Sequence, residues 1–361
     1  MDNGRKRKIK RIIITTFCRL VLVLAVMLVV FQSVRAIGKK HLMNKAESDG
    51  PDLSLVGVSN LVLTGEEEGV WQDGWVKYDG KNYTYNEGIT TFLIMGIDKD
   101  SYVELMPEGT DGGQADALFL TVLNNEDKSI KVVGINRNTM TNIDIYDKTG
   151  NYVSTVIAQI AVQHGFGNGM EESCEYQQNA VRRLFYNLPI HGYAAINMSA
   201  IVTTNDAVGG VDVTVLEDLT GKDESLVKGN QVHLMGQSAF WYVKYRDTNI
   251  FGSADMRLSR QKQYLKSFIA AAKQTAKENP SLVLRLYQAV MPKMVTNVSL
   301  DEVTYLAPVL IDYQFDENGF YTMEGETVMG EEFEEFYPDE EALLRMILDI
   351  FYKEVDLEEG R

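Results

Sequence analysis

The chain has 361 residues, which is enough for one large domain or two with a buried core. Its net charge of −16 is spread unevenly, because residues 1–45 hold eleven Lys or Arg and one acidic residue, while the remainder holds 24 basic against 50 acidic residues. Such an acidic body excludes general nucleic-acid binding, which needs a basic footprint. With only Cys18 and Cys174, a disulfide framework is excluded as well.

The amino terminus predicts a membrane anchor. Residues 1–11 form a basic tail, and residues 12–34 are apolar apart from five side chains. Roughly 20 residues span a bilayer, and the positive-inside rule places the tail in the cytoplasm and the body outside. A cleaved signal peptide is the alternative, since residues 20–31 have the length of its apolar region and residues 34–36 loosely resemble a cleavage site. Both interpretations predict that the body is exported.

Residues 35–88 are predicted to be an extracellular linker and lead-in. They begin with lysines, continue through a polar stretch and end in a run of Trp and Tyr residues. Asp79-Gly80 within this run is a favoured turn, which suggests a small β-hairpin. The simpler interpretation, that the aromatic side chains only pack against the edge of the domain, is the favoured one.

Three short apolar runs separated by turn residues predict buried strands over residues 92–97, 117–123 and 129–135. Asp98, Asp116 and Arg137 stand at the ends of these runs. Ligands of open α/β sheets gather at strand ends, and two carboxylates with a guanidinium are the components of a site for a metal ion and a phosphate. The alternative is that the two aspartates are turn or cap residues.

Helical and strand patterns alternate along the rest of the chain, which predicts an α/β layered sheet. A helix is expected where Val156, Ile157, Ile160 and Ala161 recur at helical spacing. Further helices are expected over residues 173–186, 201–208, 253–272, 282–294 and 339–352. Further strands are expected over residues 193–198 and 211–216. The segment from residue 280 onward shows no chemistry and is expected only to complete the fold.

Four basic side chains lie close together in the sequence of this otherwise acidic body. Lys244 and Arg246 end the aromatic segment 236–246, whose local pattern does not distinguish helix from strand, and Arg257 and Arg260 share one stripe of the following helix. These side chains are candidates for phosphate binding. Ion-paired or solvated surface charges are the alternative.

Motifs for a conventional nucleophile or a zinc site are missing, since the chain has no G-x-S-x-G, P-loop, H-E-x-x-H or C-x-x-C pair. Its four histidines have no ligand spacing. Carboxylates that suit a hard cation and basic side chains that suit phosphate remain.

With these features the chain resembles the LytR-CpsA-Psr (LCP) family of bacterial envelope glycopolymer transferases. The resemblance covers residues 89–353, with residues 354–361 as a tail, and the single anchor before them also fits. It is carried by six segments in the family's order: FLIMGID (92–98), QADALFLTVLN (114–124), VVGINRNT (132–139), NDAVGGVDV (205–213), GQSAFWYVKYR (236–246) and RLSRQKQYL (257–265).

The resemblance implies an αβα arrangement around a central mixed sheet, in a single-pass protein of the bacterial cell membrane whose main domain is extracellular. It implies Mg²⁺-assisted transfer of a glycopolymer phosphate from a polyprenyl-pyrophosphate carrier to peptidoglycan. By position, Asp98 and Asp116 match the catalytic aspartates that hold the metal, and Arg137 matches a catalytic arginine. The residues expected to bind the pyrophosphate are Lys99, Arg137, Lys244, Arg246, Arg257, Arg260 and Gln261.

Three departures from the family pattern weaken the expected grip on phosphate. Gln114 stands where the family usually has an arginine, Asn138 stands where it has an aspartate, and Lys244 replaces an arginine. A catalytically weakened or non-catalytic binder of polyprenyl-linked glycans is therefore the alternative function. A membrane-bound transcription regulator is disfavoured, because the short tail 1–11 cannot hold a DNA-binding fold.

Overall fold

The computed structural model describes residues 25–46, 50–63, 72, 74–106, 111–279, 281–315 and 318–355. Its centre is a six-stranded sheet with the order β12-β9-β4-β5-β6-β13. The bounds of these strands are β4 Ile89–Ile97, β5 Ala115–Asn124, β6 Ser129–Ile135, β9 Gly192–Asn197, β12 Met294–Thr296 and β13 Phe320–Thr322. The sheet is mixed, since β9 runs parallel to β4 and β13 parallel to β6, while the other neighbours are antiparallel.

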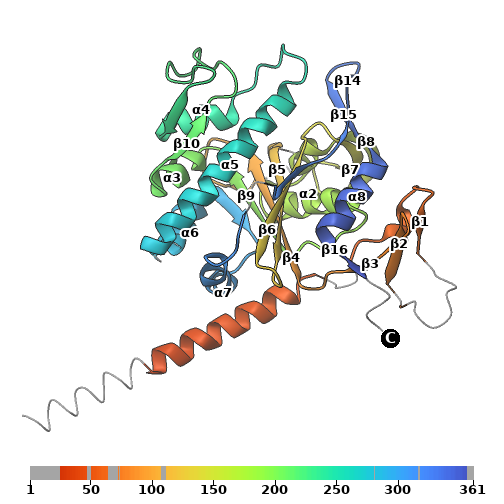
Figure 1. Ribbon diagram of the computed structural model, residues 1–361. Helices are drawn as coiled ribbons and strands as arrows, with labels where there is room; N and C mark the ends of the chain where they lie inside the picture. Colours follow the sequence, from red (N-terminus) through yellow and green to blue (C-terminus); the bar gives the residue numbers. More distant parts are fainter. Residues whose placement is uncertain are drawn as a thin grey trace, which may run out of the picture.

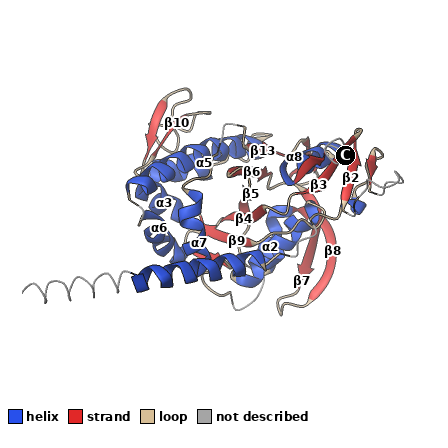
Figure 2. Cartoon of the chain, turned by 60° about the horizontal axis from the view of Figure 1, so that its bottom comes forward, coloured by secondary structure: helices blue, strands red, loops and turns tan. Residues whose placement is uncertain are grey.

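The three central strands confirm the three apolar runs read from the sequence. Residues of β4, β5 and β6 are largely buried because both faces of the sheet are covered. On one face, Leu93 and Met95 belong to a core that includes residues of α2 and α8. On the other face, Phe92 and Val132 lie in a core against which Leu265 of α5 packs. Helices therefore cover both faces (Figures 1 and 2).

Most of the predicted helices are confirmed. The helices of the body are α2 Glu171–Leu184, α3 Ala200–Ala207, α4 Gly236–Lys244, α5 Ser253–Glu278, α6 Leu282–Val290, α7 Leu300–Leu310 and α8 Glu340–Phe351. The side chain of Asp339 accepts a hydrogen bond from Ala342 N at the start of α8, as an N-cap residue does. The segment 236–246, ambiguous in the sequence, begins as the helix α4.

The helix expected around residues 156–161 is wrong. Residues Met140–Tyr146 (β7) and Tyr152–Gln159 (β8) pair as an antiparallel hairpin, and Ile160–Phe166 is a 3₁₀ helix. Val156 and Ile157 are exposed while Ile160 and Ala161 are buried, so the four residues do not share one face. The β-branched residues of the segment favour an extended strand, which the helical spacing of four side chains concealed.

The hairpin at Asp79-Gly80 is present. Strands β2 (Trp75–Tyr78) and β3 (Lys81–Tyr85) are joined through Asp79 and Gly80, both with positive φ, as a type I′ turn requires. They join β1 (Leu61–Val62) and β16 (Tyr352–Val355) in a four-stranded sheet. The aromatic residues therefore do more than pack on an edge, because they form the strands that attach the end of the chain.

The predicted anchor lies partly outside the described residues, which begin at residue 25 and continue as a helix to residue 43. This helix extends away from the body in Figure 1. Within the described part of the chain, no helix is both long and apolar enough to cross a membrane. Near its end, Leu42 is fully buried, and Gly38 allows close approach to α7, because a Cβ there would lie 2.1 Å from the Asp301 carbonyl oxygen.

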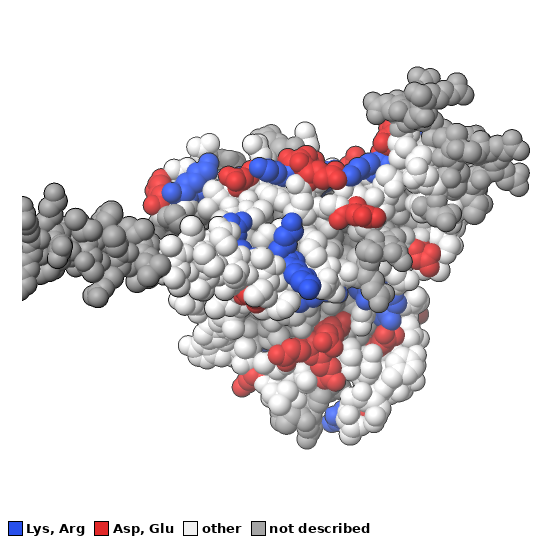
Figure 3. All heavy atoms as spheres, turned by 90° about the horizontal axis from the view of Figure 1, so that it is seen from below, with Lys and Arg blue, Asp and Glu red and all other residues white. Residues whose placement is uncertain are grey.

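Charge is mixed on the face of the body that Figure 3 shows. A short row of Lys and Arg side chains crosses the middle of this face, and Asp and Glu side chains lie on both sides of it. The acidic excess of the sequence is therefore interrupted here by basic side chains.

Candidate functional site

Three predicted site residues from separate segments meet at one ion-pair cluster. The Arg137 Nε lies 3.1 Å from Asp116 Oδ1, and an Arg257 terminal nitrogen lies 2.9 Å from Asp116 Oδ2. Arg257 also donates a hydrogen bond of 3.1 Å to the Asp116 carbonyl oxygen. The side chains are only 4 to 15% exposed, so solvent screens these pairs weakly.

The sheet explains why these residues meet. Because β5 is antiparallel to both β4 and β6, its start lies beside the ends of its two neighbours. Asp116 in the start of β5 is therefore close to Asp98 after β4 and to Arg137 after β6. Helix α5 crosses this edge with Arg257 near its beginning. The prediction that strand ends gather these side chains agrees with the geometry.

Gln114 connects Asp98 with Arg137. Its backbone N–H donates to Asp98 Oδ1 at 2.7 Å, and its side-chain oxygen accepts a hydrogen bond from Arg137. The family pattern has an arginine at this position, so an acceptor here replaces a cation. Together with Asp116, Gln114 orients Arg137, a role that the carboxylate missing at Asn138 would otherwise share.

Two adjoining pockets open on this cluster. One, of about 490 Å³, is lined by Arg137, Arg246 and Glu334, and the other, of about 470 Å³, is lined by Asp98 and Lys99. Gln114 and Val162 line both pockets, so they form the boundary between them. An elongated ligand with two neighbouring anionic groups fits such an arrangement.

The electrostatics favour an anion in the larger pocket. Loss of solvation lowers the pKa of Arg137, and the charges of Arg257 and Arg246 add to this effect, while Asp116 opposes it. The pKa of Arg246 is lowered for the same first reason, with Arg257 again adding to the effect. Guanidinium groups that repel one another in a partly desolvated site gain most from a phosphate bound between them.

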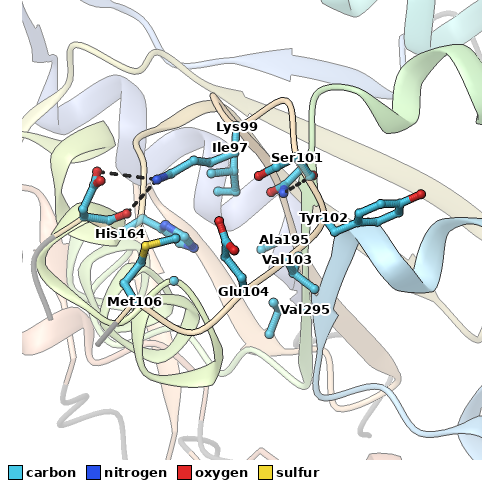
Figure 4. Close-up of a pocket in the computed structure, with 14 residues that line it drawn as sticks. Ile97, Lys99, Ser101, Tyr102, Val103, Glu104, Met106, His164, Ala195 and Val295 are labelled. Atoms are coloured by element: carbon cyan, nitrogen blue, oxygen red, sulfur yellow. Dashed lines mark hydrogen bonds and ion pairs between the residues drawn. The ribbon is translucent and has the colours of Figure 1, made fainter. Parts of the chain in front are cut away.

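Both predicted lysines are paired elsewhere. The Lys244 Nζ lies 2.9 Å from Asp100 Oδ1, and the Lys99 Nζ donates to the Asp111 carbonyl oxygen at 2.8 Å. Figure 4 shows Lys99 with its interactions drawn beside a small neighbouring cavity of about 20 Å³. Each lysine would have to exchange its partner in order to reach a phosphate.

Arg260 and Gln261 make buried contacts with the end of α4, and their expected role in pyrophosphate binding stays a prediction. Arg260 is 1% exposed, and its guanidinium donates to Glu217 and to the carbonyl oxygens of Tyr242 and Tyr245. Gln261 is also buried and donates to the Val243 carbonyl oxygen at 3.3 Å. Both residues hold the carboxyl end of α4.

Through these contacts Arg260 lies against the segment that carries Arg246. Arg246 directly follows Tyr245, the C-cap residue of α4, whose carbonyl oxygen Arg260 binds. Fixing the end of this helix fixes the point from which the Arg246 side chain begins. The sequence places Arg257 and Arg260 on one stripe of the helix. That pattern could not show that the two side chains contact different elements.

Sequence reasoning missed Glu334 as a site residue and named Asn138 only as a departure from the family pattern. The strands β14 (Gly325–Met329) and β15 (Glu334–Pro338) form a hairpin, and Phe336 N donates to the Asn138 carbonyl oxygen at 2.9 Å. Glu334, only 9% exposed, contributes to the larger pocket. The part of the chain expected only to complete the fold thus contributes to the site. Its many acidic residues resembled a solvated surface segment, and no local signal distinguished Glu334 from them.

The fit of this site to Mg²⁺ rests on two carboxylates. Among the described residues no group of three or more His, Cys, Asp or Glu side chains gathers as a metal site. Partial loss of solvation raises the pKa of Asp98, a hydrogen bond from Gln114 opposes this, and the charge of Asp116 raises it further. A cation near Asp98 would relieve that repulsion. Mg²⁺ commonly uses one or two carboxylates together with water and substrate phosphates, so the donor set fits.

Comparison with known proteins identifies the family. The model of the LytR_cpsA_psr family matches residues 63–346, which is more than half of the chain. The chain belongs to the LytR-CpsA-Psr family. Among curated relatives of this LCP protein, the polyisoprenyl-teichoic acid–peptidoglycan teichoic acid transferase TagU of Bacillus anthracis (strain CDC 684 / NRRL 3495) is 29% identical over 199 residues, or 54% of this chain. The chain spans 58% of the length of that relative.

Solved structures show the same LCP fold. Bacillus subtilis TagV is 21% identical with a TM-score of 0.55, over 73% of this chain and 95% of TagV. The protein gbs0355 from Streptococcus agalactiae is 19% identical with a TM-score of 0.58, over 73% of this chain and 86% of that protein. The prediction of a mixed α/β fold around a central mixed sheet is confirmed.

Proposed function

We propose that this LCP protein transfers a glycopolymer phosphate from a polyprenyl-pyrophosphate carrier to a hydroxyl group of peptidoglycan. The observation that carries the proposal is that Arg137, Arg246 and Asp98 line two adjoining pockets. Asp116, itself paired with Arg257, binds Arg137 beside them. The relative TagU, a polyisoprenyl-teichoic acid–peptidoglycan teichoic acid transferase, supports the same reaction class. The glycopolymer itself is not specified by these residues.

In the proposed reaction the arginines bind charge and hold geometry. Arg137 and Arg246 line the larger pocket and would bind non-bridging oxygens of the pyrophosphate. These contacts strengthen as negative charge develops on the leaving group. Arg257 and Asp116 hold each other in place, and Asp116 in turn positions Arg137. Catalysis of this kind depends on position and charge, which agrees with the missing nucleophile motifs.

Asp98 and Asp116 are the residues that would hold Mg²⁺. When bound, the ion would neutralise charge on the pyrophosphate oxygens and so stabilise the departing polyprenyl phosphate. Asp98 is the better placed of the two, because both carboxylate oxygens of Asp116 already contact arginines. Of the two carboxylate oxygens of Asp98, only Oδ1 accepts a hydrogen bond from the described part of the chain.

The proposed place of action is the outer face of the bacterial cell membrane, with residues 12–34 as a single-pass anchor. The described start of the first helix agrees with this, because Val26, Met27, Leu28 and Val29 are more than half exposed. Exposed apolar side chains on a helix suit a lipid environment.

A non-catalytic glycan binder is the second candidate, and Gln114 and Lys244 favour it. Gln114 supplies an acceptor in place of a cation, and Lys244 is paired with Asp100. Fewer free cations at the pockets would reduce stabilisation of the transition state more than binding of the ground state.

The full chain in detergent, incubated with a polyprenyl-pyrophosphoryl saccharide, Mg²⁺ and peptidoglycan fragments, tests the choice. Release of polyprenyl phosphate together with a saccharide-bearing fragment, lost in Asp116→Asn and kept in the exposed control Asp312→Asn, supports the transferase. Tight binding of the saccharide lipid with no release supports the binder. The absence of both binding and release would overturn both candidates.

A further inference from the structure

Glu334 lines the same pocket as two arginines of the site. The pocket of about 490 Å³ is lined by Arg137 and Arg246 and by Met329, Phe333 and Glu334 of the β14–β15 hairpin. Figure 1 shows this hairpin beside β7 and β8. An acceptor bound in this pocket would therefore lie close both to Glu334 and to the arginines that bind the phosphate.

Glu334 is held in place by neutral donors. Its Oε1 accepts a hydrogen bond from Gly252 N at 2.7 Å, and its Oε2 accepts one from Asn138 Nδ2 at 3.3 Å. Its carbonyl oxygen also accepts a hydrogen bond from Gln159 at 2.7 Å. Three separate elements thus fix a carboxylate that is 9% exposed, and its charge opposes the lowering of the Arg246 pKa.

The two aspartates of the site are less suited to accept a proton. Both oxygens of Asp116 lie within 3.1 Å of arginine nitrogens, and an ion-paired carboxylate is a weak base. Asp98 lines the neighbouring pocket, beyond Gln114, and is the preferred ligand for the proposed metal. A metal-bound carboxylate is likewise a weak base. Glu334 is the remaining carboxylate that is both buried and open to the arginine pocket.

We infer that Glu334 is the general base of this site. This inference rests on the proposed transferase function. The acceptor hydroxyl oxygen attacks the phosphorus that bears the glycan, and its proton moves to a Glu334 carboxylate oxygen. The new oxygen–phosphorus bond forms while the bond from that phosphorus to the bridging oxygen breaks. The electron pair leaves with the polyprenyl phosphate, and Glu334 then returns its proton to water. General-base assistance of this kind typically contributes about 100-fold or more.

The test measures turnover of the full chain with a polyprenyl-pyrophosphoryl saccharide and peptidoglycan fragments. Glu334→Gln keeps the size of the side chain and an acceptor for Gly252 N, and we expect it to lower kcat about 100-fold, with unchanged binding of the saccharide lipid. The acid limb of the pH–rate profile should disappear with it. Glu331→Gln is the matched control, because Glu331 is an exposed carboxylate between β14 and β15 that does not line this pocket.

The possible outcomes distinguish failure of the Glu334 assignment from failure of the proposed transferase function. If the wild type releases polyprenyl phosphate and Glu334→Gln does so within about twofold, or loses lipid binding instead of kcat, the assignment is overturned while the transferase stands. If the acid limb disappears in Asp98→Asn and persists in Glu334→Gln, Asp98 is the base. If the wild type releases nothing, both proposals fail. Should Glu334→Gln not fold, Glu334→Asp decides, with a lowered kcat and a retained acid limb expected.

Discussion

Arg257 binds Asp116 twice, through the carboxylate at 2.9 Å and through the main-chain carbonyl oxygen at 3.1 Å. One side chain of α5 is thereby fixed to the strand β5, at the edge of the sheet where Arg137 also contacts Asp116. The pair joins the helix layer to the sheet at the site itself. Removing Asp116 would leave the buried Arg257 guanidinium without this partner, and removing Arg257 would leave Asp116 with Arg137 alone.

Arg257→Gln should destabilise the protein. We expect the free energy of unfolding to fall by about 3 kcal/mol, because Asp116 loses one of its two charged partners and the hydrogen bond to its carbonyl oxygen in a weakly solvated place. Urea unfolding followed by circular dichroism measures this change. Arg285→Gln, an exposed position on α6, is the matched control and should stay within about 0.5 kcal/mol of the wild type. Equal stability of both variants would contradict the role given to Arg257.

Arg246 and Arg260 should respond differently to the same substitution. Arg246→Gln removes a pocket-lining charge, so we expect pyrophosphate to bind about tenfold more weakly, or about 1.4 kcal/mol, with little change in stability. Arg260→Gln removes the group that binds the carbonyl oxygens at the end of α4, so stability should fall by about 3 kcal/mol.

Calorimetric titration with pyrophosphate and thermal unfolding of both variants separate these effects. Arg182→Gln, exposed on α2, serves as the control for the loss of one positive charge. The assignment would be wrong if Arg260→Gln weakened binding and left the unfolding temperature unchanged.

Gln114→Arg should strengthen phosphate binding at a cost in stability. The substitution adds a guanidinium between the two pockets and removes the oxygen that accepts a hydrogen bond from Arg137. We expect about tenfold tighter binding of pyrophosphate at low salt, and a free energy of unfolding lower by about 1 kcal/mol. Binding should also depend more steeply on salt concentration. Gln114→Lys is the comparison that keeps the charge without the bidentate geometry, and equal gains for both variants would argue against that geometry.

The raised pKa of Asp98 predicts how its removal affects stability. The folded protein binds the proton of the Asp98 carboxyl group more tightly than the unfolded chain does. Ionisation of Asp98 therefore lowers the free energy of unfolding as the pH rises from the ordinary carboxyl pKa through the folded pKa. Asp98→Asn should therefore be more stable than the wild type at neutral pH, and the difference should shrink as the pH falls below about 4. Denaturant unfolding at a series of pH values measures the difference. A variant less stable at neutral pH would show that ionised Asp98 stabilises the fold.

Local sequence was sufficient for the sheet centre and for much of the site. Continuous apolar runs predicted β4, β5 and β6, because strands covered on both faces need apolar side chains at nearly every position. Asp98, Asp116 and Arg137 were found because they directly follow or begin these strands. Local sequence was insufficient for β8. There the spacing of Val156 and Ile157 relative to Ile160 and Ala161 predicted a helix, although Val156 and Ile157 are both exposed.

What the sequence by itself determined was the set of buried strands and the chemical types of the side chains at their ends, since both depend on neighbours along the chain. Only the tertiary structure decided which charges reach the pockets and which are used elsewhere. Arg260 differs from Arg257 because the carbonyl oxygens at the end of α4 lie against it. Glu334 entered the site because a distant hairpin pairs with the loop after β6, and such long-range contacts leave no local pattern in the sequence.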